Sequence, residues 1–275
     1  MEGHINWVYI SLSSMLFFKT INKAVVFLFP SPVKLRDQTR KVWLWENLAT
    51  SWVHSVISAA LSIYSIYSTP SIIEDMINTN NSLLYSTLAI SVGYFVYDLI
   101  DLAINDLQRS FCVIIHHVLV ISSFLVCLLG NRLIPFAIFA LLVEVNSVFL
   151  HARCLMRMTE LDQNGLVYKI NRILLMITFI LFRFVNCGWV TICLVSSRHV
   201  INWLPFTIGF GGMCIASLQN VGLLKQVWTS DAKSKMKQSQ HEKTGGDKDH
   251  NENKSNGSEK LRELLKVTNA CSTCS

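Results

Sequence analysis

Long apolar runs separated by short polar segments make up most of the chain before Thr229. A helix needs about 20 mostly apolar residues to cross the hydrocarbon core of a bilayer. Seven runs approach or exceed that length, at roughly residues 6–29, 45–67, 83–104, 111–129, 133–152, 172–195 and 203–227. Because such runs, bounded by polar turns, are typical of membrane helices, the pattern predicts an all-α, polytopic membrane helical bundle with about seven transmembrane helices.

The first run is the least regular of the seven, since Lys19 and Lys23 interrupt it. A charge at mid-bilayer costs on the order of 2.5–3.5 kcal/mol on insertion scales. Four residues apart, the two lysines share a helix face, which either turns toward the bundle or lets them extend to the membrane boundary. A cleaved signal peptide is the alternative interpretation, but the segment from Met1 to Trp7 lacks a positively charged start. We therefore expect a retained first helix.

Beyond the last run, the chain from Asp231 to Ser258 is rich in Lys, Ser, Asn, Gly and Asp, a composition typical of disorder. We expect three parts: an N-terminal transmembrane helix and basic cytosolic linker at 1–39, a membrane domain at 40–230, and a disordered cytosolic tail at 231–275. The tail starts with a basic juxtamembrane segment, which we expect to attract anionic cytosolic lipids by about 1 kcal/mol for each lysine. Its basic residues are Lys233, Lys235 and Lys237.

Composition and charge agree with a membrane protein and add an orientation. Hydrophobic residues make up 51% of the chain and charged residues only 15%, against roughly 25% charged in soluble domains. In a seven-helix topology, most of the basic residues fall into loops on one side of the membrane, and basic loops stay cytosolic. The N-terminus is therefore predicted outside and the C-terminus in the cytosol. Asn80 begins an Asn-Asn-Ser sequon in an outside loop, which predicts glycosylation there.

Other common kinds of site are not indicated. Of the eight cysteines, six lie in or beside apolar runs and two close the tail, so no disulfide framework is expected. No HxxxH or HxxE spacing on a predicted helix brings two metal ligands onto one face, so we expect no metal site. The chain has no glycine pattern for a nucleotide, and we expect no cofactor and no nucleic-acid partner.

Ionisable and amide side chains inside the apolar runs are the strongest functional signal, because such residues are rare in membranes and usually face the bundle interior. Counting from the polar turns places side chains from five helices at a similar depth, nearer the cytosolic face than the centre, with Arg183 deeper. This predicts a polar pocket that opens toward the cytosol. The candidate residues are His54, Asp98, Asp101, His116, His117, Glu144, Asn146, Arg183 and Asn220.

The pair His116-His117, together with Asp98, is the best candidate for chemistry. Adjacent helical residues point about 100° apart, so the two rings cannot serve one packing contact. An imidazole beside a carboxylate can take a proton from an attacking hydroxyl or amine, or attack a thioester itself. The alternative is that these side chains only join helices by hydrogen bonds worth about 0.6 kcal/mol each. For Arg183 we expect pairing with Glu144 or an aspartate.

From about Arg40 to Asp231 the chain resembles the TLC (TRAM, LAG1, CLN8) domain family. Within the family it is most similar to a plasma-membrane pair of TLC domain-containing proteins. The resemblance rests on the order and spacing of several segments, each weak alone. These segments are Trp43 to Leu48 with His54, Val92 to Phe95 with Asp98 and Asp101, His116-His117, Leu142 to Ser147 with His151 and Arg153, and Leu181 to Phe184 with Gly188-Trp189.

The resemblance implies a function in lipid metabolism. The similar proteins limit the incorporation of polyunsaturated acyl chains into phospholipids and so lower membrane fluidity. The ceramide synthases of the family transfer an acyl group from acyl-CoA to a sphingoid amine, with a paired-histidine motif like His116-His117. This chain has Glu144-Val145-Asn146-Ser147 where those enzymes carry a His-Asp and then a Ser-Asp element. It also lacks their inserted soluble domain. Both departures argue against sphingoid N-acylation.

We therefore expect a regulator of membrane phospholipid acyl composition, located in the plasma membrane or, second, in the endoplasmic reticulum. Its expected partners are membrane phospholipids or fatty acyl chains; the sequence identifies no protein partner. Two alternatives stay open. One is a His-dependent acyltransferase with acyl-CoA as co-substrate, and the other is a scaffold that modulates a membrane channel or enzyme.

Overall fold

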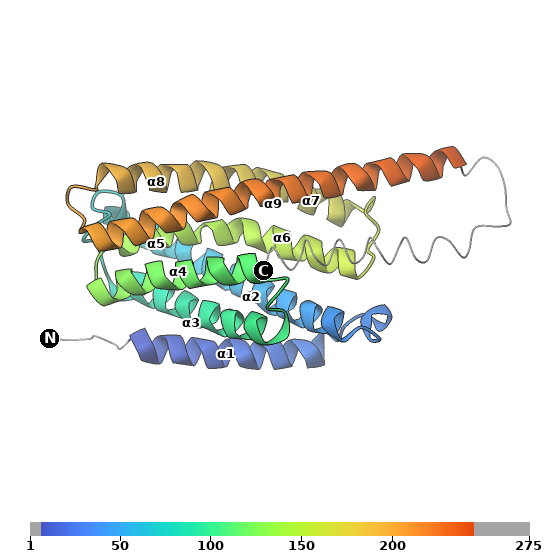
Figure 1. The fold of residues 1–275 in the computed structure, drawn as a ribbon, viewed down its shortest axis with the longest axis horizontal. Coiled ribbons are helices and arrows are strands. Elements are labelled where there is room, and N and C mark those ends of the chain that lie inside the picture. Colours follow the sequence, from blue (N-terminus) through green and yellow to red (C-terminus); the bar gives the residue numbers. More distant parts are fainter. Residues whose placement is uncertain (1–6, 245–275) are drawn as a thin grey trace.

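The computed structural model describes the backbone of residues 7–244 and the side chains of residues 7–232. Long helices run roughly parallel and antiparallel along one axis, and the described residues contain no strand (Figure 1). The all-α bundle predicted from the apolar runs is therefore confirmed. Its helices are α1 (Trp7–Leu28), α2 (Thr39–Ser68), α3 (Ser82–Asn105), α4 (Phe111–Gly130), α5 (Ile134–Leu141), α6 (Val143–Met158), α7 (Leu166–Thr178), a π-helical segment (Phe179–Asn186), α8 (Cys187–Ser196) and α9 (Trp203–Thr244).

Six helical stretches in the described residues are long and apolar enough to cross a membrane. They correspond to six of the seven predicted runs, because α5 with α6, and α7 with α8, each form one stretch. The seventh run is α2, which has 30 residues, enough for about 45 Å of helix. Its buried face carries serines at helical spacing, which makes it more polar than the others: Ser51, Ser55, Ser58, Ser62 and Ser65.

Helix α1 packs closely against α3. The hydroxyl groups of Ser11 and Ser14 donate hydrogen bonds to the carbonyl oxygens of Ala89 (2.8 Å) and Ile90 (2.7 Å). Gly93 makes this approach possible, since a Cβ atom at that position would lie 2.2 Å from the Ser11 carbonyl oxygen. Small residues that let backbones approach are typical of packed membrane helices.

Lys19 and Lys23, which interrupt the first apolar run, are both exposed in the structure. They therefore lie on the outer surface of α1 and do not face the bundle. Of the two orientations that the sequence left open, this one keeps both ammonium groups out of the packed interior and allows them to extend to the membrane boundary.

Helix α9 is longer than the sequence pattern predicts. It continues to Thr244 and extends past the ends of the other helices (Figure 1), so the start of the segment expected to be disordered, from 231, is helical. The physical reason is that Ala, Lys, Met, Gln and Glu, all good helix formers, follow Asp231 without Gly or Pro until Gly245. The rest of the tail lies outside the described residues.

Candidate functional site

A cavity of about 370 Å³ lies inside the bundle, with α4 and α9 along its length. This volume is within the roughly 300–1,000 Å³ that ligand pockets occupy. One end, where α9 begins, is apolar and is lined by Leu133, Phe136, Leu194 and Pro205. The other end, where α4 begins, is lined by polar side chains from α2, α3, α4, α6, the π-helical segment and α9. The cavity is therefore amphipathic along its length, as an acyl chain with a polar group would require.

Six of the nine residues predicted to form a pocket line this cavity: His54, His116, His117, Glu144, Arg183 and Asn220. The remaining three, Asp98, Asp101 and Asn146, lie behind this lining. Asp98 and Asn146 contact lining residues directly. Asp101 is one step further away, since it shares the Asn47 amide with Asp98.

His117 and Asp98 form the pair that the sequence singled out. The His117 Nδ1 and Asp98 Oδ2 atoms are 3.4 Å apart, and both side chains are buried. Asp98 is held in place because its other oxygen accepts a 2.7 Å hydrogen bond from the Asn47 amide. The His–Asp contact itself lacks hydrogen-bond geometry.

The two neighbouring histidines have different surroundings. Their ring centroids are 5.8 Å apart and their planes differ by 47°. His117 packs on Phe95 and faces Asp98, whereas His116 lies near Gln219 of α9, whose amide donates a 3.0 Å hydrogen bond to the Cys112 carbonyl oxygen. As expected for adjacent helical residues, the rings do not share one contact, and only His117 is beside a carboxylate.

His54 is largely a packed residue. Its ring stacks on Tyr94 with centroids 3.6 Å apart, and the rings of Phe18 and Phe95 pack edge-on against it. One edge still reaches the cavity wall. These ring contacts indicate that His54 packs helices together rather than takes part in a reaction.

Arg183 lies in the π-helical segment, a feature that often marks functional sites. Its guanidinium donates to the side-chain oxygens of Asn146 (2.5 Å), Asn220 (2.9 Å) and Ser147 (3.1 Å). These three acceptors are amide and hydroxyl groups, and Glu144 also interacts electrostatically with the guanidinium. Glu144 accepts a 2.7 Å hydrogen bond from Ser55. The network therefore holds a cationic group at the cavity wall by neutral oxygens from α6 and α9.

Sequence reasoning missed His151 as a site residue, although it belongs to a segment that carries the family resemblance. It lines the polar end of the cavity, is only 4% exposed, and its Nδ1 atom has no hydrogen-bond partner among the described residues. Its spacing from Glu144 and Ser147 places all three on one face of α6. That spacing is the signal that could have identified it.

Two other predictions concern sites outside the cavity. The side-chain amide of Asn80 donates a hydrogen bond to Asn131 in the structure; its glycosylation stays a prediction. The described residues contain no group of three or more His, Cys, Asp or Glu that could hold a metal ion.

Comparison with known proteins gives a consistent match across the membrane part. The family model described as TLC domain matches residues 44–230. TLC domain-containing protein 2 of Danio rerio is 37% identical over 220 residues, which are 80% of this chain and 87% of that protein. TLC domain-containing protein 2 of Homo sapiens is 27% identical over 228 residues, 82% of this chain and 85% of that protein. TLC domain-containing protein 1 of Homo sapiens is 27% identical over 181 residues, which are 66% of this chain and 72% of that protein.

Proposed function

The chain belongs to the TLC domain family, and on that basis we propose that it regulates the acyl composition and fluidity of membrane phospholipids. It is an integral membrane protein with several apolar helices. The observation that supports the proposal most is the amphipathic cavity, which offers an apolar end for an acyl chain and polar groups at the other end.

The orientation of the cavity adds to this proposal. Its polar end lies where α4 begins and α9 leaves the bundle, and we expect this end to face the cytosol because basic loops stay there. A fatty acyl donor from the cytosolic side would then enter with its polar group near His116 and His151 and its chain along α4 and α9. We propose the plasma membrane as the location, by analogy with the similar proteins.

In the first mechanism the protein acts as a binder. The cavity holds a fatty acyl chain or phospholipid and so alters what acyltransferases incorporate, without any reaction of its own. Arg183 and His151 would orient the polar group, since one is cationic and the other has an unsatisfied ring nitrogen at the cavity wall.

The second candidate is acyl transfer from acyl-CoA, and the 3.4 Å separation of His117 and Asp98 is the observation that favours it. His117 would take the proton from an acceptor hydroxyl or amine as its oxygen or nitrogen attacks the thioester carbon. The carbon–sulfur bond then breaks, and the proton passes to the departing CoA thiolate. Asp98 would hold the imidazole in the productive orientation.

The test is a deletion of the gene in its own cells, followed by feeding a polyunsaturated fatty acid and measuring phospholipid acyl chains by mass spectrometry. Rescue would compare wild type with the His116→Ala/His117→Ala variant, matched for expression and location. His199→Ala is the control, since His199 is exposed in the loop before α9, outside the cavity lining.

We expect deletion to raise polyunsaturated phospholipids, and wild type and His199→Ala to restore them while the double variant does not. Full rescue by the double variant would favour the scaffold alternative. An unchanged acyl profile after deletion would contradict the proposal itself. Purified protein with acyl-CoA then separates the mechanisms, because only the transferase forms product.

A further inference from the structure

A second hollow lies on the side of the bundle, between α7 and α9, and shares no residue with the internal cavity. Its volume is about 420 Å³. It lies between the second half of α7 and the part of α9 from Trp228 to Ala232, toward the same end of the bundle as the polar end of the cavity. We call it the α7–α9 groove, defined by Arg172, Ile173, Met176, Ile177, Trp228, Asp231 and Ala232.

The groove changes from apolar to basic along α7. Ile173 and Ile177 are 56% and 50% exposed, so they offer apolar surface to an occupant rather than to the core. Arg172 lies at the end of this stripe nearest the start of α7, and Lys169 is one turn before it on the same face. On α9, Trp228 is exposed beside them. Tryptophan is typical of the membrane–water interface.

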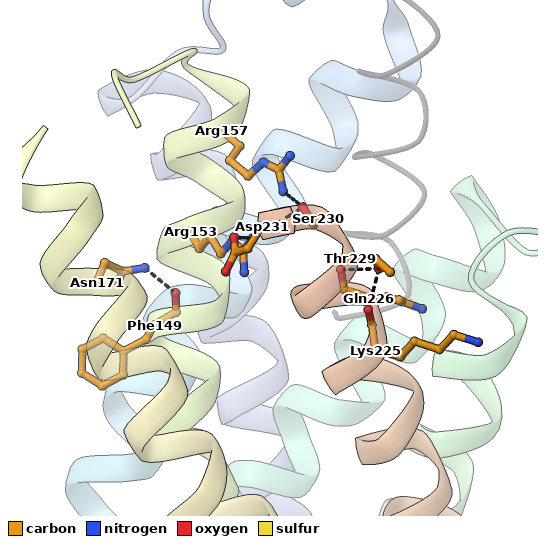
Figure 2. Close-up of polar contacts among 9 residues, drawn as sticks. All are labelled: Phe149, Arg153, Arg157, Asn171, Lys225, Gln226, Thr229, Ser230 and Asp231. Atoms are coloured by element: carbon orange, nitrogen blue, oxygen red, sulfur yellow. Dashed lines mark hydrogen bonds and ion pairs between the residues drawn. The ribbon is translucent and has the colours of Figure 1, made fainter. Parts of the chain in front are cut away.

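The acidic residue of the groove, Asp231, is already matched by a cation. Figure 2 shows Arg153 and Arg157 of α6 reaching Ser230 and Asp231 of α9, where Arg153 forms an ion pair with Asp231. By contrast, no described carboxylate lies within ion-pair distance of Arg172 or Lys169. The groove therefore keeps an uncompensated positive charge at its polar end.

We propose that the α7–α9 groove binds one anionic phospholipid of the surrounding leaflet. Its phosphate would contact Arg172, with Lys169 adding attraction, and an acyl chain would lie against Ile173, Ile177 and Trp228. Basic pockets between membrane helices bind anionic head groups in this way. A zwitterionic lipid would bind less well, because its own ammonium group competes with the two basic side chains for the phosphate. This site is independent of the function proposed for the internal cavity.

The test places the full-length protein in phosphatidylcholine vesicles with increasing fractions of brominated phosphatidylglycerol or brominated phosphatidylcholine. Bromine quenches nearby tryptophan, and subtracting the signal of the Trp228→Phe variant isolates Trp228 from the seven tryptophans. We expect the quenching of Trp228 to saturate at a lower fraction of brominated phosphatidylglycerol than of brominated phosphatidylcholine. Arg172→Gln should weaken that preference about five-fold, the effect of one basic group near an anionic surface, and Arg172→Lys should keep most of it.

Lys225→Gln is the matched control. It removes one positive charge near the same end of α9, but its side chain extends away from α6 and the ion pair in Figure 2 and does not line the groove. An equal loss in Arg172→Gln and Lys225→Gln would mean diffuse attraction and would overturn the proposal. The proposal would also be overturned if the two brominated lipids quenched Trp228 equally and Arg172→Gln left that quenching unchanged. If Arg172→Gln fails to fold, Lys169→Gln provides the same comparison with a smaller expected loss.

Discussion

At the scale of single residues, the paired histidines show how neighbouring positions acquire different roles. His117 lies 3.4 Å from a carboxylate that is itself fixed by Asn47, whereas His116 faces Gln219 on α9. Of the two, His117 is the one beside a carboxylate, which could orient the ring and raise its basicity for proton transfer. The structure thus narrows a two-residue motif to one candidate base, and it adds His151 of α6 as a polar group that lines the same cavity.

Replacing Asp98 with Asn tests this distinction, because it keeps the shape and an acceptor for Asn47 but removes the charge beside His117. If His117 acts as a base, we expect acyl-profile rescue to fall at least ten-fold, since general-base catalysis contributes about 10²–10⁴. Thermal unfolding in detergent should change little. Asp162→Asn, in an exposed loop, is the charge-matched control. Full rescue by Asp98→Asn would mean that the Asp98 carboxylate has only a structural role.

At the scale of elements, helix contacts depend on polar and small side chains as much as on apolar ones. The hydrogen bonds of Ser55 with Glu144 and of Ser58 with Ser91, the Ser11 and Ser14 hydrogen bonds of α1, and the Arg153–Asp231 ion pair between α6 and α9 all join helices through polar groups. In a bilayer this is expected, because lipid tails are as apolar as leucine and provide no hydrophobic drive between helices.

Gly93→Ala should loosen α1 from α3. The new methyl group would lie 2.2 Å from the Ser11 carbonyl oxygen and 2.7 Å from the Ser14 Cβ atom, and a backbone atom cannot yield as a flexible side chain can. We expect a loss of about 1–3 kcal/mol, typical of overpacking, measured by thermal unfolding and by protease sensitivity of α1.

Gly188→Ala is the control for this change. Nothing lies within 4 Å of a Cβ atom at Gly188, and alanine favours a helix over glycine by up to about 1 kcal/mol. We therefore expect Gly188→Ala to be neutral or stabilising. Equal stability of the two variants would show that the α1–α3 contact tolerates an added methyl group.

At the scale of the whole molecule, the direction of the cavity depends on the topology of the bundle. Its polar end is cytosolic only if the basic loops are cytosolic, and the same topology places Asn80 outside. We expect an endoglycosidase to lower the apparent mass of the wild-type protein from cells. Asn80→Gln should remove this effect. The tail has sequons at Asn253 and Asn256, and the Asn253→Gln/Asn256→Gln variant should leave the effect intact. Loss of the glycan in that double variant instead would indicate the opposite orientation.

The apolar runs predicted the helices well, since each long run corresponds to a helical stretch and most boundaries agree within a few residues. The largest difference is at the end of α9, where the absence of apolar residues indicated disorder although good helix formers continue the helix to Thr244. The pattern of apolar residues indicates which parts of the chain leave water. Helix formation also depends on the intrinsic helix propensity of each residue, and the polar residues after Asp231 have a high propensity.

The sequence by itself determined the class of protein, the family, and which polar residues lie within the membrane, because these follow from local composition and order along the chain. Only the tertiary structure decided which of them meet: His117 with Asp98, Arg183 with Asn146 and Asn220, and Asp231 with Arg153. Such pairs join residues 19 or more positions apart, and they depend on how each helix is rotated and crossed against its neighbours. That geometry is set by packing across the whole bundle and cannot be inferred from one run at a time.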